Sequence, residues 1–190
     1  MHEPLLPEPA DLKRSRQMAE VKSDAARVVA EMVKNKRELA PALANQVAGA
    51  IAKSFGVKLE EVGILRLLPT GDQIEFVVPE KLARVGTIPV SSMTALAART
   101  VRKGKAEFTN RFTSDKHQTI FEAVPLSDER GEPIQKIMSV PIRSGGKVVG
   151  VIQVSRKGKT SSVSGADFTR TNLTALEEVA AVLTECFQPN

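Results

Sequence analysis

The stretch Ile137–Val154, which reads IMSVPIRSGGKVVGVIQV, decides the fold that we expect. Two runs rich in valine and isoleucine flank Arg143–Lys147, in which Gly145-Gly146 can adopt the positive φ angles of a tight turn. The stretch therefore predicts a β-hairpin. Every residue from Val148 to Val154 except Gln153 is apolar or glycine, so we expect other elements to cover both faces of this strand.

Two residues inside the hairpin carry further information. Gly150 lies in the middle of a strand, where glycine costs stability, and this predicts that a helix or a ligand approaches the sheet closely there. Pro141 has no N–H to donate to a neighbouring strand. We expect it at an edge, a bulge or a strand end.

The composition is that of a globular protein with one ordinary domain and an appendage. The chain has 190 residues, of which 42% are hydrophobic and 26% are charged. No apolar run approaches the roughly 20 residues of a membrane span, and the N-terminus has no apolar signal core. We therefore predict a cytoplasmic protein without membrane contact.

The residues that bind metals and form disulfides are few. Cys186 is the only cysteine, and the only histidines are His2 and His117. One cysteine excludes an internal disulfide and a zinc cluster built on cysteines. We predict neither a metal site nor a cofactor.

The net charge of +5 is unevenly distributed. Residues 99–116 hold six basic and two acidic side chains, and residues 143–159 hold five basic side chains and no acidic one. Charge alone is compatible with nucleic acid, but the chain has no Trp, no Tyr and no helix-turn-helix or zinc module. We expect solvated loops and helix faces instead, without direct nucleic-acid binding.

The N-terminal part is expected to have two segments. Residues 1–17 contain several prolines and are predicted to be disordered or extended. Residues 18–37 form a predicted helix with apolar residues at alternating spacings of three and four, as in the seam of a coiled coil. This helix could build a homodimer or lie on its own domain. The seam residues are Met18, Val21, Ala25, Val28 and Met32.

Apolar periodicity and turn residues divide the rest of the chain into helices and strands. A helix is predicted from Pro41, with an apolar stripe that Gly56 ends. Another is predicted from Ser91, as N-cap, to about Lys103. The other predicted elements are strands over Val62–Leu68, Ile74–Val78 and Lys105–Thr109 and a closing helix over Phe168–Phe187.

This order is α+β with an antiparallel sheet, and the chain resembles a GAF domain. The resemblance rests on Ile88-Pro89 after Gly86, on Ala97–Gly104 (AARTVRKG), on Met138–Val154 and on Phe168-Thr169. It covers about residues 38–188. It implies a five- or six-stranded sheet with the first and last helices on one face. On the other face it implies a small-molecule pocket under an irregular helical region.

The chain departs from two groups of GAF domains. Members that bind cyclic nucleotides resemble one another in an Asn-Lys…Phe-x3-Asp-Glu signature, which here reads Ser155-Arg156…Phe168-x3-Asn172-Leu173. A Lys–Asp ion pair would become Arg156 facing neutral Asn172, which argues against cyclic nucleotides. Members that bind bilins offer a cysteine thiol, and residues 38–185 contain none.

The cysteine content also argues against a third group. Members that reduce free methionine sulfoxide use several thiols for attack and resolution, whereas this chain has only Cys186. Its neighbours Leu183 and Phe187 predict a packed, inert thiol. Since no nucleophile, base and oxyanion hole assemble elsewhere, we expect that the chain is not an enzyme.

Ten residues are candidates for the ligand site, each with an alternative role. Ser91 and Ser92 could bind an anion through backbone amides or cap a helix. His117 beside Asp115 could act as a base or belong to a lid. The other candidates are Arg111 as a lid residue, Arg99 as an inward or a surface cation, and Phe76, Phe108, Phe112 and Phe121 as pocket wall or core.

Two functions remain open. In the first, the chain senses an unidentified small molecule, anionic or polar, and relays its presence through the terminal helices of a homodimer. In the second, side chains fill the pocket and the domain is a dimerisation scaffold. The fold does not fix what a pocket binds, so the sequence leaves the ligand unnamed.

Overall fold

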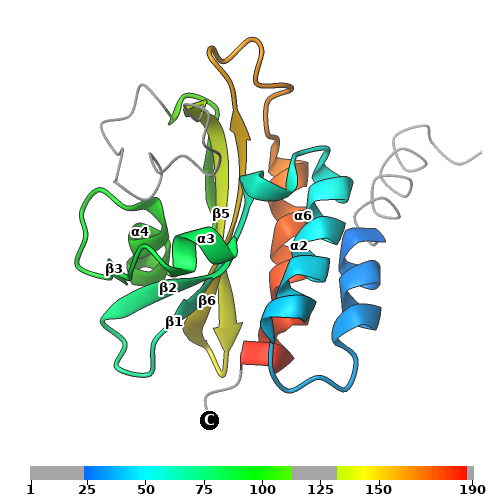
Figure 1. Cartoon of the computed structure of the whole chain (residues 1–190), viewed down its shortest axis with the longest axis vertical. Helices are drawn as coiled ribbons and strands as arrows, with labels where there is room; N and C mark the ends of the chain where they lie inside the picture. Colours follow the sequence, from blue (N-terminus) through cyan, green and yellow to red (C-terminus); the bar gives the residue numbers. More distant parts are fainter. Residues whose placement is uncertain (1–23, 113–131, 188–190) are drawn as a thin grey trace, which may run out of the picture.

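A computed structural model describes residues 24–112 and 132–187 of the chain (Figure 1). It contains one six-stranded sheet with the order β3-β2-β1-β6-β5-β4, in which all pairs are antiparallel. The predicted α+β class and antiparallel sheet are confirmed. The strands are β1 (Val62–Leu67), β2 (Gln73–Val78), β3 (Ile88–Pro89), β4 (Glu107–Thr109), β5 (Ile134–Ser144) and β6 (Lys147–Lys157).

The predicted hairpin is the centre of the sheet. β5 and β6 have 11 residues each, and β6 lies between β5 and β1. Gly145 and Gly146 connect them with φ angles of 54° and 80°, which glycine adopts without strain. The hairpin prediction is confirmed, although β5 begins at Ile134 and not at Ile137.

Pro141 lies on the free side of β5. β4 pairs with β5 only at Ile137–Ser139, whereas β5 continues along β6 to Ser144. A proline at an edge leaves no interstrand hydrogen bond unmade, because its missing N–H faces away from the partner strand. The edge prediction is therefore confirmed.

Helices cover one face of the sheet (Figure 1). α2 (Pro41–Phe55) begins at the predicted proline and ends at Gly56, whose φ is 60°. α6 (Arg170–Leu183) begins after Thr169, whose side chain accepts a hydrogen bond from the backbone N of Asn172. Together with the turn η3 (Thr184–Phe187), these helices bury the large apolar core of the domain.

Two short helices, α3 (Glu80–Ala83) and α4 (Leu96–Lys103), lie over the other face (Figure 1). The apolar residues on this second face form two small clusters and not one continuous core. Neither α3 nor the pairing of β3 with β2 is predicted from the sequence. The predicted N-cap of α4, Ser91, is wrong, because the N-cap in the structure is Ala95.

The helical segment 24–33 packs against its own domain. Ala25, Val29 and Val33 are buried in the large core, and Met32 packs against it, while Val28 is 41% exposed. The helix ends before Asn35, which adopts a left-handed φ of 62°. The segment therefore lies on its own domain, which is one of the two arrangements that the sequence left open. Dimerisation through this segment stays a prediction.

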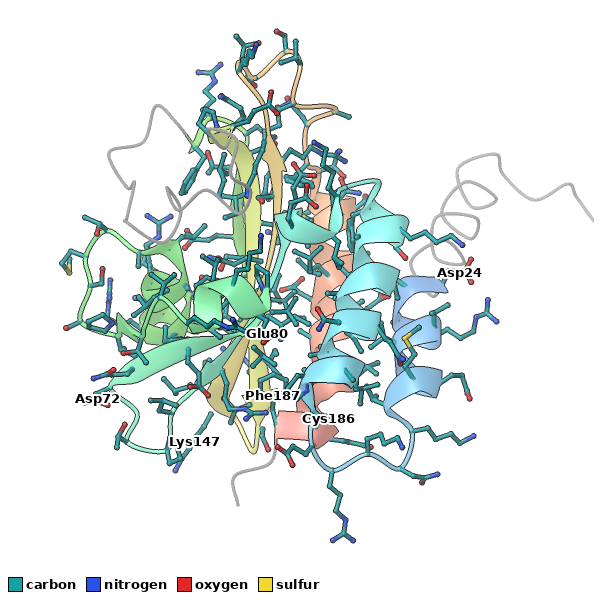
Figure 2. The ribbon with its side chains drawn as sticks, in the orientation of Figure 1. Asp24, Asp72, Glu80, Lys147, Cys186 and Phe187 are labelled. Carbon is teal, nitrogen blue, oxygen red and sulfur yellow. The ribbon has the colours of Figure 1, made fainter. Side chains whose placement is uncertain are left out.

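Gly150 is a site of close approach, as predicted. A Cβ atom there would lie 2.6 Å from the backbone O of Leu65 and 2.8 Å from Cε1 of Phe187. The crowding groups are thus the backbone of the neighbouring strand β1 and the ring of Phe187 in η3, which Figure 2 labels. No side chain fits at this position without a shift of one of them.

Candidate functional site

Three polar side chains are buried on the sheet face beneath α4. Thr100 and Ser139 are 0% exposed, and Gln153 is 8% exposed. Nε2 of Gln153 donates to Oγ of Ser139 at 3.4 Å, and the two hydroxyl oxygens of Ser139 and Thr100 are 2.7 Å apart. Oγ1 of Thr100 donates to the carbonyl of Leu96 at 3.0 Å, so the Ser139 hydroxyl donates to Thr100.

The geometry of the hairpin brings these residues together. Side chains alternate between the two faces of a strand, so Met138 and Val140 enter the helical core while Ser139 points to the other face. Ser139 lies opposite Gln153 on β6, and Gln153 lies opposite Gly63 on β1. The row Gly63, Gln153 and Ser139 thus crosses three strands, with Thr100 of α4 above it.

This polar chain has one unused end. Within the described residues, the Gln153 side chain makes only the bond to Ser139, which leaves its carbonyl oxygen as a spare acceptor. Within the described residues, this oxygen is not among the fully buried polar atoms that lack a partner, so solvent reaches it. Phe76, Phe112 and Ile137 belong to the apolar clusters on the same face of the sheet. A polar molecule that donates to Gln153 could therefore replace solvent at this acceptor.

The phenylalanines predicted for the pocket lie on different faces. Phe76 and Phe112 are buried on the face beneath α4. Phe108 pairs with Met138 and packs against the helical core on the opposite face, so its assignment to the pocket is corrected. The alternation along β4 causes this, because Phe108 follows the side-chain direction of Met138. Phe121 lies outside the described residues.

The predicted cations are on the outside of the site. Nε of Arg99 donates to Oε1 of Glu107 at 2.8 Å, an ion pair that joins α4 to β4. Arg111 is exposed after the end of β4. Asp115 and His117 lie outside the described residues.

Ser91 and Ser92 precede α4 but do not start it. The helix begins at Leu96, and Oγ of Ser92 accepts from the backbone N of Ala95 at 3.2 Å. The guanidinium of Arg102 donates to the carbonyl of Ser92 at 2.6 Å and to that of Val90. Because Arg102 binds these carbonyls, the chain makes a turn there, and the predicted helix start at Ser91 is corrected.

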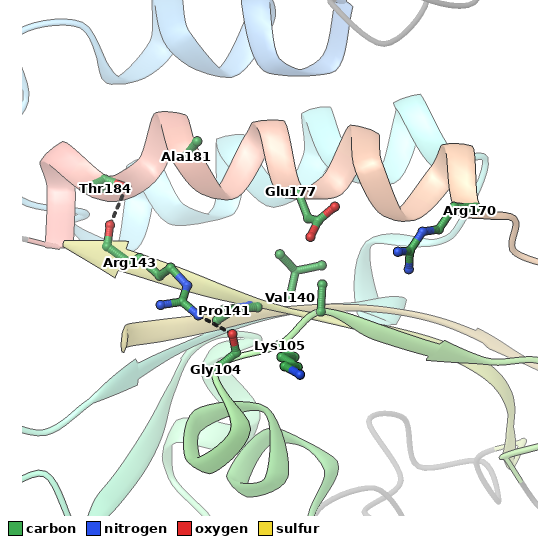
Figure 3. A pocket seen from close by; sticks show the side chains of 10 residues that line it. Gly104, Lys105, Val140, Pro141, Arg143, Arg170, Glu177, Ala181 and Thr184 are labelled. Carbon is green, nitrogen blue, oxygen red and sulfur yellow. Dashed lines mark hydrogen bonds between the residues drawn. The ribbon is translucent and has the colours of Figure 1, made fainter. Parts of the chain in front are cut away.

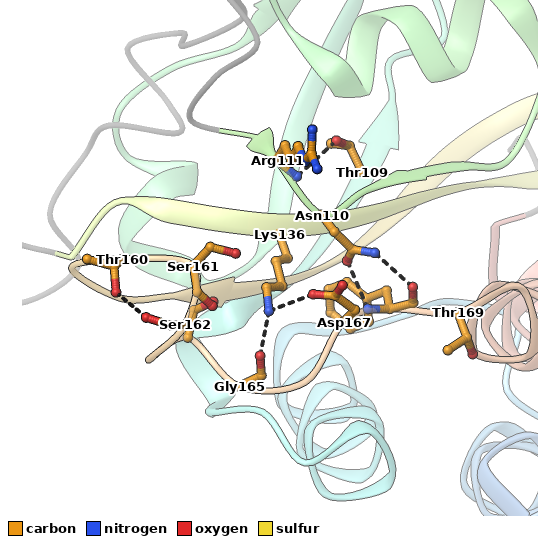
Figure 4. A network of polar contacts seen from close by, with 12 residues as sticks. Thr109, Asn110, Arg111, Lys136, Thr160, Ser161, Ser162, Gly165, Asp167 and Thr169 are labelled. Atoms are coloured by element: carbon orange, nitrogen blue, oxygen red, sulfur yellow. Dashed lines mark hydrogen bonds and ion pairs between the residues drawn. The ribbon is translucent and has the colours of Figure 1, made fainter.

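A second polar network fixes the loop between β6 and α6 (Figure 4). Nζ of Lys136 donates to the carbonyl of Gly165 at 2.5 Å and forms an ion pair with Asp167 at 2.8 Å. Asn110 exchanges two hydrogen bonds with the backbone of Phe168. This network holds the start of α6 against β4 and β5, so we assign it a structural role.

Arg156 and Asn172 do not face each other. The Arg156 guanidinium donates to the carbonyl of Phe55 at 2.9 Å and lies 5.0 Å from the centre of the Phe168 ring. Asn172 accepts hydrogen bonds from Thr169 at the start of α6. The sequence predicted that Arg156 would face Asn172 in place of a Lys–Asp ion pair. This prediction is wrong, because Arg156 binds the C-terminal end of α2 and Asn172 binds Thr169 at the start of α6.

The only cysteine, Cys186, is buried in the large apolar core on the helix face of the sheet (labelled in Figure 2). Sγ of Cys186 is 3.5 Å from the carbonyl of Lys36. Burial, together with the charge of Glu185, raises the pKa of the Cys186 thiol, so the thiolate is disfavoured at neutral pH.

The described residues contain no group of three or more His, Cys, Asp or Glu side chains that could hold a metal ion. In the same part of the chain, no helix has both the length and the apolar character that a membrane span requires.

The comparison with protein families decides the identity of the fold. The family model of the GAF domain matches residues 39–188. The chain belongs to the GAF domain family. No curated protein matches this GAF domain.

Solved structures of GAF domains are similar to this one. The GAF domain of an Acinetobacter phosphoenolpyruvate-protein phosphotransferase has a TM-score of 0.66 at 14% identity, and the match covers 87% of this chain and 92% of that one. The nlh2 GAF domain of A. aeolicus, in an inactive state, has a TM-score of 0.62 at 12% identity, covering 90% and 97%. At these identities the likeness establishes the fold alone.

A third neighbour corrects the expectation that the chain is not an enzyme. Free methionine-R-sulfoxide reductase from Neisseria meningitidis, solved with its substrate, has a TM-score of 0.59 at 16% identity. The match covers 98% of this chain and 96% of the reductase. An enzyme therefore uses the same fold over almost the whole chain, and membership in the GAF family does not exclude catalysis.

Proposed function

We propose that this GAF domain binds a small polar molecule against the sheet face beneath α4 and has a regulatory role. GAF domains are generally ligand-binding or regulatory domains, and this chain shares their fold. The observation that carries the proposal is the chain of hydrogen bonds from Gln153 through Ser139 to Thr100, which leaves the carbonyl oxygen of Gln153 free for a ligand donor.

The surroundings favour a ligand with both polar and apolar parts. Phe76 and Phe112 supply aromatic surface, and most small-molecule sites combine such surface with a few directed polar groups. The three hydrogen-bonding side chains are neutral, and Arg99, the predicted cation on α4, is paired with Glu107. The site therefore recognises its ligand by hydrogen bonds rather than by net charge.

The hairpin offers a route from this site to the helices. Ser139 belongs to the site, while its neighbours Met138 and Val140 pack in the helical core. A ligand that shifts β5 on one face would change the packing of α6 on the other. In our proposal this is the relay, and the exposed Val28 in the helical segment 24–33 belongs to the contact between two copies.

The test is a screen for compounds that raise the melting temperature. A ligand at 100 times its dissociation constant stabilises the fold by about 2.7 kcal/mol, which a thermal melt detects. We expect the shift in the wild type and its loss in Gln153→Leu, which removes the acceptor. Gln46→Leu, the same substitution at an exposed position of α2, is the matched control and should keep the shift.

Native mass spectrometry of the purified chain complements the screen. A co-purified small molecule in the wild type that Gln153→Leu lacks supports the proposal. If no compound shifts the melt and no small molecule co-purifies, the scaffold function replaces the ligand-binding proposal. The hydrogen bond between Ser139 and Thr100 would then have a structural role, since it satisfies the buried hydroxyls without a ligand.

A further inference from the structure

A second site lies beside the free edge of β5. A hollow of about 480 Å³ opens between α6, this edge and the connection from α4 to β4 (Figure 3). Small-molecule sites typically measure roughly 300 to 1,000 Å³, so the volume is sufficient for a compact ligand. The lining residues are Gly104, Lys105, Ala106, Val140, Pro141, Arg143, Arg170, Glu177, Ala181 and Thr184.

The charged groups of the hollow are mostly unpaired. Figure 3 shows Arg170 and Glu177 reaching down from α6, while Lys105 lies on the opposite wall. Within residues 24–112 and 132–187, none of these three side chains makes a hydrogen bond or an ion pair. Arg143 differs, since its guanidinium donates to the carbonyls of Gly104 and Gly146 and fixes the wall.

Three cations against one carboxylate favour an anionic occupant. The free cations, Lys105 and Arg170, come from different elements, so an anion between them would join the start of β4 to the start of α6. An arginine fork binds carboxylate or phosphate through two parallel hydrogen bonds. Val140 and Pro141, which are buried, and the exposed Ala181 add apolar surface to the lining.

The edge itself is a poor place for another strand. Pro141 has no N–H, and the carbonyl of Arg143 accepts a hydrogen bond from the hydroxyl of Thr184 at 2.8 Å. An added strand would gain few backbone hydrogen bonds here, and backbone bonds provide most of the affinity in strand addition. The occupant must therefore use the side chains.

We propose that this hollow binds a small anion with carboxylate or phosphate groups, held between Lys105 and Arg170. Glu177 lies in the same hollow and repels an anion there, which lowers the affinity without preventing binding. The site is separate from the cluster of Thr100, Ser139 and Gln153, and its existence does not depend on the function proposed for that cluster.

The test is an NMR titration of the full chain with inorganic phosphate and, separately, with citrate, at constant ionic strength. We expect saturable shifts in the backbone amides of residues 104–106, 142–143 and 177–184. Arg170→Gln and Lys105→Gln should each weaken binding about tenfold, as expected for the loss of one charge-assisted contact. Glu177→Gln should strengthen it about threefold, because a repulsive charge is removed.

A matched variant tests whether the anion binds in the hollow or to surface cations in general. Lys147→Gln removes an exposed cation at the hairpin turn, outside the hollow, and should leave the affinity unchanged. The same spectra show whether each variant is folded. Equal weakening by Lys147→Gln, or no saturable shift with either anion, would overturn the proposal. Shifts confined to Gly63, Ser139 and Gln153 would also overturn it, because the anion would then bind beneath α4.

Discussion

The two faces of the sheet are packed in different ways. Beneath α2, α6 and segment 24–33, side chains from β1, β2, β5 and β6 form one continuous apolar core. Beneath α3 and α4, the apolar residues fall into two small clusters separated by the buried polar row of Ser139 and Gln153. The same strands supply both faces, since successive side chains point in opposite directions.

This difference indicates that one face mainly stabilises the fold and that the other can bind a ligand. A continuous core gains free energy in proportion to the apolar area that it buries, and any polar group within it is a cost. Two small clusters around hydroxyl and amide groups gain less, but they offer directed hydrogen bonds to a ligand. Substitutions of residues on the two faces of the sheet can therefore test this difference.

The largest expected effect is the loss of a core leucine on the helix face. Leu176 is 0% exposed, and Leu176→Ala should lower the free energy of unfolding by about 2–5 kcal/mol. Leu82→Ala, in a small cluster on the other face, should cost clearly less, because fewer neighbours lose contacts. Urea denaturation measures both. Equal losses would contradict the contrast between the two faces.

Gly150 and Gly49 test how tightly the helix face is packed. Gly150→Ala should lower the free energy of unfolding by about 1–3 kcal/mol, because its Cβ would meet Leu65 and Phe187. Gly49 lies inside α2, and apart from the backbone of that helix a Cβ atom there would meet no atom within 4 Å, so Gly49→Ala should raise the free energy of unfolding by about 0.5–1 kcal/mol. A thermal melt that Gly150→Ala leaves unchanged would show that this face is open.

The smallest effect on stability is expected at Val28, on the outside of the helical layer. Its side chain is 41% exposed, so Val28→Lys should change the free energy of unfolding by no more than about 0.5 kcal/mol. If two copies meet through segment 24–33, the same substitution should convert a dimer into a monomer. Light scattering measures this. A dimer that survives Val28→Lys must use another surface.

Long elements with a clear period could be predicted from the sequence. The apolar stripe of α2, the turn at Gly145-Gly146 and the closing helix all follow from local spacing. The short elements could not, because contacts from distant residues decide them. Arg102 binds the carbonyls of the turn before α4, and nothing near Ser91 in the sequence indicates this.

The site could be predicted only in part. The sequence shows Gln153 as the one residue of Val148–Val154 that is neither apolar nor glycine, and this indicates a special position. Counting from the turn would place Ser139 opposite Ile152, but the register shifts by one between Ile142 and Arg143, so Ser139 lies opposite Gln153. A bulge of this kind cannot be counted from local spacing, and Thr100 comes from a helix 39 residues away.

The most direct test compares two neighbouring residues of β6 that point to opposite faces. Ile152→Val should lower the free energy of unfolding by about 0.5–1.5 kcal/mol and leave intact the melting shift caused by the most effective compound of the screen. Gln153→Leu should abolish that shift while changing the melting temperature of the free protein less than Ile152→Val does. A shift that survives Gln153→Leu, or one that Ile152→Val removes, would contradict the assignment of binding to the face beneath α4.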